Sequence, residues 1–219
     1  MTDFTFHGHD TAHDILEDVG HAYNPTCVLY LGACCGYEAG LIADKYPEAA
    51  VYAVEACKET YDRFLGNTRE CAGPRVIAHN LAIGEFDGTA TLNLDESNTK
   101  HSVLRQVDAG RTGETREVRM ASLATYCKEL AIAPDVLVID LEGIAVRALR
   151  GLGEDLMAGV NCVIAETEPA GANVFEGGDT NEDFAWFMSS HAFRLEKLWL
   201  PGSPVRQLNS VWVRWGKRA

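Results

Sequence analysis

Apolar runs of strand length alternate with stretches of helical periodicity along most of this chain. The strand-like runs occupy residues 27–31, 51–55, 75–78, 135–139 and 161–165. Helical spacing of apolar residues follows at 37–45, 58–71, 122–130, 144–149 and 181–191. Strands and helices that alternate in this way form a mostly parallel sheet joined by right-handed crossovers. The pattern therefore predicts an α/β fold with helices on both faces of the sheet.

The last two strand-like segments, 193–198 and 210–213, are joined by a loop that contains Pro201, Gly202 and Pro204. This loop is too short for the helical crossover that two parallel neighbours need. One of the two strands must therefore run antiparallel, at or near an edge of the sheet. Because no linker or repeat divides the chain, we expect residues 1–219 to form a single domain.

Three further segments add to this pattern. Residues 10–19 carry an apolar stripe of helical spacing, so the segment 1–24 is predicted to place a helix over the core. Alternating residues at 89–94 and 115–120 predict two extra strands. Residues 95–113 are polar, and a loop of that length in a compact domain is usually functional. We expect this loop to lie on the substrate side of the site.

The first strand ends in a glycine turn, Gly32-Ala-Cys-Cys-Gly36, and a helix follows at once. In open α/β sheets a strand, a glycine turn and a helix present a helix N-terminus to a ligand. Glu55 ends the second strand, 23 residues after Gly32. A carboxylate at that place can accept both hydroxyls of a ribose. We therefore expect an adenosine-containing cofactor to lie across the two strand ends.

The spacing of the glycines narrows the choice of cofactor. Dinucleotide-binding turns read GxGxxG, and their middle glycine lets the backbone touch a pyrophosphate. This chain has Cys34 at that place. The difference argues against a nicotinamide-dependent oxidoreductase and favours a cofactor without phosphates, such as S-adenosylmethionine. The structural alternative is that Gly32 and Gly36 only relieve crowding between strand and helix.

Charge and composition exclude some classes of function. The chain has 19 basic and 32 acidic residues, which give a formal net charge of −13. Such a surface repels phosphate backbones, so we expect no nucleic-acid partner. No apolar run approaches the length of a membrane span, so we expect no membrane partner. The seven cysteines, several of them within apolar patterns, and the lack of a signal-peptide pattern predict a cytoplasmic protein.

Five motifs occur along the chain in a characteristic order: Gly32-Ala-Cys-Cys-Gly36, Val51-Tyr-Ala-Val-Glu55, Asn80-Leu-Ala-Ile-Gly84, Val138-Ile-Asp-Leu-Glu-Gly143 and Ile164-Ala-Glu166. In order and spacing, residues 25–168 resemble the FkbM-type S-adenosylmethionine-dependent methyltransferases. The resemblance implies the class I methyltransferase (Rossmann-like) fold, a mostly parallel seven-stranded sheet with the last strand antiparallel. It also implies methyl transfer, commonly to a hydroxyl oxygen of a sugar or a natural product.

The resemblance also assigns site residues by position. The residues implied to line the methionine part of the cofactor are Gly32, Ala33 and Gly36. Glu55 would bind the ribose diol, with Ala56 beside it. The residues implied to lie by the adenine are Asn80, Leu81 and Ala82. Asp140 would lie near the methyl group, and Ser102 would face the substrate.

Carboxylates leave two adjacent strands in pairs, Asp140 with Glu142 and Glu166 with Glu168. Residues two apart in an extended chain point to one side, so these side chains should gather above the carboxyl edge of the sheet, where α/β proteins bind ligands. Their mutual repulsion should raise at least one pKa, which suits a general base. We predict catalytic roles for Asp140 and Glu142 and a substrate contact for Glu166. The structural alternative is that Glu142 caps the next helix.

His101, beside Ser102 in the polar loop, is the other candidate base; the alternative is a solvated histidine. No spacing of cysteines and histidines indicates zinc, and we predict no metal site. A divalent metal held by the carboxylates stays open as an alternative, although the family resemblance does not demand one.

Four residues depart from the family pattern: Tyr30, Cys34, Val138 and Ala145. These departures keep a second hypothesis open, a non-catalytic protein of the same fold that binds the cofactor or another nucleoside. For the enzyme, we expect a small-molecule acceptor bounded by the N-terminal helix and by the loops 95–113 and 171–179. A homodimer is left open.

Overall fold

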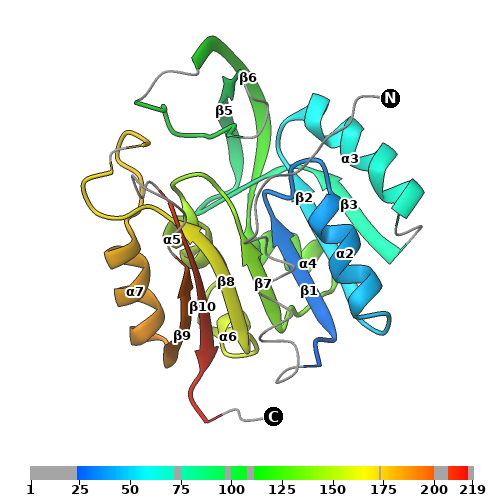
Figure 1. The fold of residues 1–219 in the computed structure, drawn as a ribbon, viewed down its shortest axis with the longest axis vertical. Helices are drawn as coiled ribbons and strands as arrows, with labels where there is room; N and C mark the ends of the chain where they lie inside the picture. The colour runs from blue at the N-terminus through cyan, green and yellow to red at the C-terminus, as the bar shows by residue number, and fades with distance from the viewer. Residues whose placement is uncertain are drawn as a thin grey trace.

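The computed structural model describes residues 24–71, 75–96, 100–107, 111–172, 174–199 and 207–216. The helix predicted at 10–19 lies outside the described residues. Within them, strands and helices alternate as the apolar pattern predicts (Figure 1).

Seven strands form the main sheet, in the order β3-β2-β1-β7-β8-β10-β9. They are β1 (Cys27–Leu31), β2 (Ala50–Glu55), β3 (Val76–Asn80), β7 (Val136–Ile139), β8 (Cys162–Thr167), β9 (Phe193–Trp199) and β10 (Leu208–Arg214). Pairing is parallel from β3 to β8, whereas β10 lies between β8 and β9 and is antiparallel to both. The antiparallel strand is thus the last strand of the chain, one place from the edge, as predicted.

Helices cover both faces of this sheet. The helices are α2 (Tyr37–Lys45), α3 (Lys58–Cys71), α4 (Leu123–Leu130), α5 (Ala145–Arg150), α6 (Glu154–Met157) and α7 (Asn181–Ser190). Buried side chains of α2 and α3 pack in one apolar cluster with Val28 and Tyr30 of β1. Buried side chains of α4, α5 and α7 pack in a second cluster with Leu29 and Leu31. Because successive strand residues face opposite sides, β1, β2, β7, β8 and β10 each contribute to both cores.

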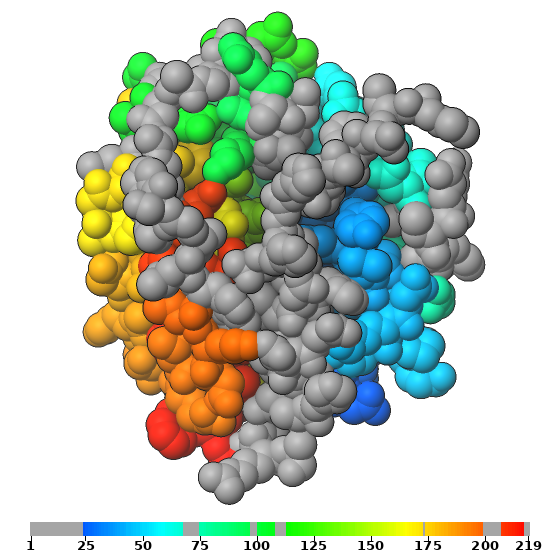
Figure 2. Space-filling view, in the orientation of Figure 1, coloured from blue at the N-terminus to red at the C-terminus, as the bar shows by residue number. Residues whose placement is uncertain are grey.

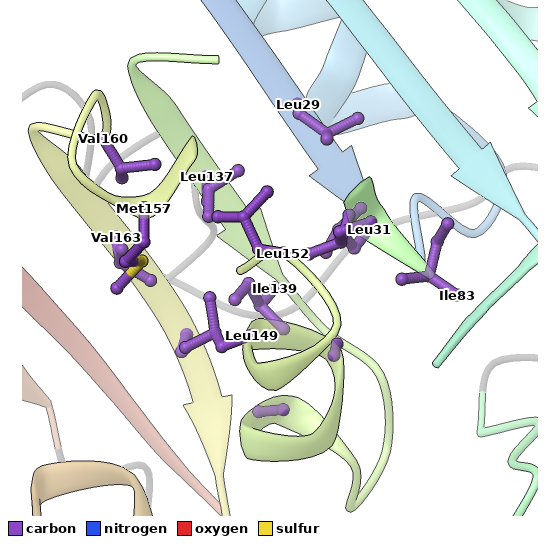
Figure 3. Close-up of a cluster of buried hydrophobic side chains, with 14 of the residues drawn as sticks. Leu29, Leu31, Ile83, Leu137, Ile139, Leu149, Leu152, Met157, Val160 and Val163 are labelled. Atoms are coloured by element: carbon purple, nitrogen blue, oxygen red, sulfur yellow. The ribbon is translucent and has the colours of Figure 1, made fainter. Parts of the chain in front are cut away.

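The second core is drawn in Figure 3, where Leu137 and Ile139 of β7 lie close to Leu149 of α5. Strand β7 is buried along its whole length. A fully buried strand needs apolar residues at every position, which explains why this segment shows no alternation of polar and apolar residues in the sequence.

A smaller three-stranded sheet extends from the main one. It contains β4 (Ala82–Gly84), β5 (Gly88–Asp95) and β6 (Arg111–Ser122), in the order β4-β6-β5. Strand β5 is antiparallel to β6, and β4 is parallel to it. In Figure 1 the β5–β6 pair projects above the main sheet.

The prediction of a loop over residues 95–113 is wrong at both of its ends. Asp95 still belongs to β5 and Arg111–Gly113 belong to β6, because Asp95 pairs with Arg111 in the hairpin. Backbone hydrogen bonds hold this pairing, so the polar side chains that predicted a loop do not prevent a strand. The loop also turns back on the hairpin, where Asn93 and Ser102 exchange backbone hydrogen bonds.

Helix termini follow local chemistry closely. Thr180 and Asp183 form a capping box at the start of α7, each side chain accepting the other's backbone N–H. The side chain of Ser122 accepts the backbone N–H of Thr125 at the start of α4. Helix α6 was not predicted, because four residues are too few to display a helical period.

Seen in space-filling form, the front of the molecule has the blue segment of α2 on the right and the orange segment of α7 and β9 on the left (Figure 2). Among the helices that the structure describes, none has both the length and the apolar character needed to cross a membrane.

Candidate active site

A cleft lies at the carboxyl ends of β1, β2 and β7. Gly32, Glu55 and Asp140 from these three strand ends all line it. The chain passes from β1 outward to β2 and β3 and then returns to β7 on the other side of β1. Such a switch point is where open α/β sheets bind ligands.

Nine of the residues singled out in the sequence line this one cleft: Gly32, Glu55, Ala56, Leu81, Ala82, His101, Ser102, Asp140 and Glu142. Ala33, Gly36, Asn80 and Glu166 lie outside its lining. The structure thus brings together residues that are more than 100 positions apart in the chain. Their roles toward a ligand remain predictions.

The glycine turn after β1 is tied to β2. The backbone N–H groups of Gly32 and Ala33 both donate to the carbonyl of Val54, at 3.0 Å. Gly32 has a φ of +78°, and a Cβ there would lie 1.8 Å from the backbone oxygen of Asp140. Only glycine lets β1 and β7 approach so closely at the floor of the cleft.

Gly36 is the N-cap of α2 and has the same φ of +78°. A Cβ there would lie 2.5 Å from the ring of Phe64 in α3. Its glycine is thus explained by helix packing, which is the structural alternative left open for this residue. Gly32 differs because it also borders the cleft.

Glu55 is buried at the end of β2, with 8% of its surface exposed. Its Oε2 accepts the backbone N–H of Cys34 at 3.0 Å, and its Oε1 accepts that of Cys57 at 2.7 Å. Burial raises its pKa to about 7, although these two backbone donors work in the opposite direction. Each carboxylate oxygen has two lone pairs, so Glu55 can still accept two hydroxyl groups from the cleft.

Asn80 does not line the cleft but supports two residues that do. Its side-chain amide donates to the backbone carbonyls of Glu55 and Ala56, at 2.8 and 2.9 Å. This pair of bonds fixes the turn after β2. Leu81 and Ala82 then present apolar surface to the cleft itself, as a wall beside a flat aromatic ring would require.

His101 presents a hydrogen-bond donor to the cleft. Its Nδ1 accepts the backbone N–H of Asp95 at 3.0 Å. Burial lowers its pKa, so the ring is neutral at pH 7 and carries its proton on Nε2. Among the described residues, that buried Nε2 has no hydrogen-bond partner. This geometry favours donation to a ligand over the predicted role as a base, since a base needs an unprotonated nitrogen.

Ser102 is buried and its hydroxyl is already engaged. Its Oγ donates to the backbone carbonyl of Glu142 at 2.7 Å and accepts the backbone N–H of Leu104 at 3.0 Å. The side chain thereby ties the loop after β5 to the segment after β7. In this arrangement it shapes the cleft through Glu142, and a direct substrate contact stays a prediction.

Three carboxylates meet at the edge of the cleft. One oxygen from each of Asp140, Glu142 and Glu166 lies within 4.8 Å of the other two. The register explains why, because Ile139 of β7 pairs with Ala165 of β8 and the next residues of the two parallel strands are Asp140 and Glu166. Asp140 and Glu166 share a side of the sheet with Tyr30, which faces α2.

Burial acts on all three groups, and repulsion from neighbouring carboxylates adds to it. Burial is the main cause that raises the pKa of Asp140 well above its ordinary value, and the charges of Glu166 and Glu142 add to it. Burial, with the charges of Glu166 and Glu168, raises the pKa of Glu142 to about 8. The pKa of Glu166 also rises through burial, opposed by the positive charge of Lys100. Carboxyl groups shifted toward neutral pH are suited to general acid–base work.

The expectation that an extended chain would gather both pairs is only partly right. Glu142 has a left-handed φ of +47°, so the strand geometry ends before it and a turn returns its side chain to Asp140. Glu168 is not in the close group, because its Oε2 accepts the backbone N–H of Val174.

Glu142 does not cap α5. The N-cap residue of that helix, Ile144, receives no side-chain cap bond. The backbone N–H of Arg147 instead donates to Oδ2 of Asp179 at 3.0 Å. The carboxylate of Glu142 is free of that task and accepts from Gln207 at 2.9 Å.

Sequence reasoning missed three residues around the cluster, Glu38, Lys100 and Gln207, and noted Tyr30 only as a departure from the family pattern. Glu38 of α2 accepts a hydrogen bond from the hydroxyl group of Tyr30, and its charge acts on Asp140 and Glu166. Lys100 donates to Gln207, which in turn donates to Glu142. Only Glu38 has a local signal, since it lies in the first helical turn after the glycine turn. The positions of Tyr30, Lys100 and Gln207 depend on long-range packing.

Comparison with known proteins identifies the same family that the sequence motifs resemble. The sequence model of the methyltransferase FkbM domain matches residues 32–195. A search of the curated proteins found no significant match.

Solved structures share the architecture at low sequence identity. Magnesium protoporphyrin IX methyltransferase from Synechocystis PCC 6803, solved with bound SAM, has a TM-score of 0.57 at 12% identity, with 94% of this chain and 77% of that chain covered. Precorrin-6y C5,15-methyltransferase from Geobacter metallireducens GS-15 has a TM-score of 0.56 at 8% identity, with 98% and 93% covered. At these identities the similarity establishes the fold: the class I methyltransferase architecture.

Proposed function

Because the matched domain spans most of the chain, the protein belongs to the FkbM methyltransferase family, and we propose that it transfers a methyl group from S-adenosylmethionine to a hydroxyl oxygen of a small molecule. The observation that carries the proposal is the cleft at the switch point, with Glu55 and the Asp140–Glu142 segment both in its lining. A sugar or natural-product hydroxyl is the acceptor class that the family resemblance favours.

The residues of the cleft fit this cofactor. Glu55 offers carboxylate lone pairs to the ribose hydroxyls, and Leu81 and Ala82 offer apolar surface to the adenine. Among the described residues, the buried Nε2 of His101 and the buried Oδ1 of Asp140 have no hydrogen-bond partner. A donor and an acceptor that are both buried and unpaired indicate a polar ligand.

When bound, S-adenosylmethionine supplies a methyl group on a positively charged sulfur. The chain's own residues must position the acceptor in line with that methyl group and remove the acceptor's proton. Asp140 lines the cleft and has a raised pKa caused mainly by burial. We assign it the role of proton acceptor, with Glu142 and Glu166 as the groups that tune it.

The test combines binding and turnover. We expect S-adenosylhomocysteine to bind with micromolar affinity in calorimetry, and methyl-labelled S-adenosylmethionine to label a member of a panel of hydroxylated small molecules. Asp140→Asn should keep the binding and lose the labelling, whereas Asp62→Asn, an exposed matched change in α3, should keep both. Failure of the folded protein to bind S-adenosylhomocysteine overturns the proposal. Binding without turnover on any acceptor would favour the non-catalytic alternative.

Cofactor affinity should depend on pH through Glu55. Its pKa lies at about 7, and the ionised form is the better acceptor for two hydroxyls. Affinity should therefore rise as pH rises through 7, by about tenfold between pH 6 and pH 8, with proton release on binding. Calorimetry of S-adenosylhomocysteine in buffers of different ionisation enthalpy measures both effects. Glu55→Gln has no proton to release at this position and should lose the dependence.

A further inference from the structure

We propose that Asp140, Glu142 and Glu166 bind one divalent cation of the oxygen-preferring kind, such as Mg²⁺ or Mn²⁺. Each side chain offers one oxygen, and the three oxygens lie within 4.8 Å of one another. Hard divalent cations take carboxylate oxygens as ligands and complete their shell with water or substrate oxygens. The proposal that an ion binds here does not depend on the proposed methyl transfer.

Unsatisfied buried oxygens point to a ligand at this place. Oδ1 of Asp140 is fully buried and, within the described part of the chain, has no hydrogen-bond partner. Glu168 lies outside the close group, but it is 6% exposed, its Oε1 also has no partner among the described residues, and its charge acts on Glu142. A buried carboxylate oxygen without a partner is costly, and a cation would satisfy it.

The charges around the three carboxylates are consistent with a divalent cation between them. Among the described residues, Lys100 is the one cation whose charge acts on Asp140, Glu142 and Glu166 alike. Ion binding requires the three carboxyl groups to be ionised, and one lysine against three carboxylates then leaves two negative charges, which a divalent ion would balance. The negative charge of Glu38 also acts on Asp140 and Glu166, which increases the negative charge around the site.

Hydrogen bonds already hold two of the three carboxylates. The side-chain amide of Gln207 donates to Oε2 of Glu142 at 2.9 Å. The side chain of Asn209 forms a hydrogen bond with Glu166. Gln207 is in turn held by Lys100, whose Nζ donates to its Oε1 at 2.5 Å. Ligating carboxylates are commonly held by such partners, which fix their direction and leave other lone pairs for the ion.

The site borders the cleft, because Asp140 and Glu142 belong to its lining and Glu166 does not. An ion there would lie between the sheet edge and a ligand in the cleft. If the proposed methyl transfer holds, the ion's open positions would bind the acceptor's oxygen and lower the pKa of its hydroxyl, and Asp140 would accept the proton through the oxygen that does not bind the ion. This last consequence rests on the proposed function.

The experiment titrates Mn²⁺ into the chelator-treated full-length protein and follows the electron paramagnetic resonance signal of free Mn²⁺. We expect one saturable ion per chain. Glu166→Gln, which keeps the shape of the side chain, should weaken binding at least tenfold, and Asp140→Asn should do the same. Glu48→Gln removes the same charge from an exposed turn and should bind as the wild type does.

Absence of saturable binding at millimolar Mn²⁺ would overturn the proposal, as would wild-type binding by both cluster variants. Circular dichroism of each variant establishes that the fold is kept. Titration of S-adenosylhomocysteine into the same chelator-treated samples separates the two proposals. If S-adenosylhomocysteine binds but Mn²⁺ does not, the metal site alone is rejected. If Mn²⁺ binds but S-adenosylhomocysteine does not, the proposed function alone is rejected.

Discussion

A Gly32→Ala variant is expected to lose at least about 3 kcal/mol of unfolding free energy and all measurable binding of S-adenosylhomocysteine. The left-handed φ of +78° disfavours any residue with a Cβ. In addition, the new Cβ would lie 1.8 Å from the backbone oxygen of Asp140, which cannot move aside as a flexible side chain would. Either the turn or the end of β7 must shift, and both form the floor of the cleft.

Gly177→Ala is the matched control for this prediction. Gly177 also has a positive φ, +66°, but a Cβ there meets no atom within 4 Å. It should therefore lose only the conformational part, about 1 kcal/mol. Chemical denaturation of both variants measures the difference. Equal losses in the two variants would mean that the approach of β1 to β7 does not require glycine.

A Glu55→Ala variant is expected to bind S-adenosylhomocysteine about 100-fold more weakly, which corresponds to about 2.7 kcal/mol. The physical reason is the loss of two charge-assisted hydrogen bonds to the ribose, each worth about 1.5–3 kcal/mol before the cost of removing the carboxylate from water. The change also removes the acceptor for the backbone N–H groups of Cys34 and Cys57. Calorimetry at pH 8, where the wild-type carboxylate is ionised, gives the largest difference.

Two further variants separate ribose binding from support of the loop. Glu55→Gln keeps one acceptor oxygen and should weaken binding by about tenfold. Glu48→Ala removes a carboxylate at an exposed position before β2 and should leave the affinity unchanged. If Glu55→Ala binds as tightly as the wild type, the ribose does not lie at the end of β2.

Local patterns were sufficient for most of the helices and strands and for part of the site. The bounds of β1, α2 and α3 follow from apolar periodicity ended by glycine or proline, and the structure confirms them. Glu55 could be placed at the cleft from its distance to Gly32, because consecutive parallel strands end at one edge. The hairpin of β5 and β6 was less readable, since its pairing depends on backbone hydrogen bonds that polar side chains do not reveal.

The carboxylate cluster shows where local reasoning stops. The pairing of Asp140 with Glu166 follows from two neighbouring parallel strands and could be anticipated. The turn that returns Glu142 to them could not, because it requires a left-handed residue other than glycine. The contribution of Gln207 depends on β10 lying between β8 and β9, which is a matter of sheet order.

By itself, the sequence determined the α/β class, the glycine turn, the strand-end carboxylates and the family, because each depends on residues close together in the chain. The tertiary structure alone decided which of these residues meet. It placed Lys100, Glu38 and Gln207 around the carboxylates, gave the capping of α5 to Asp179, and engaged Ser102 with the backbone. The physical reason is that strand order and register are set by packing and hydrogen bonding between distant segments, which leave no local signature.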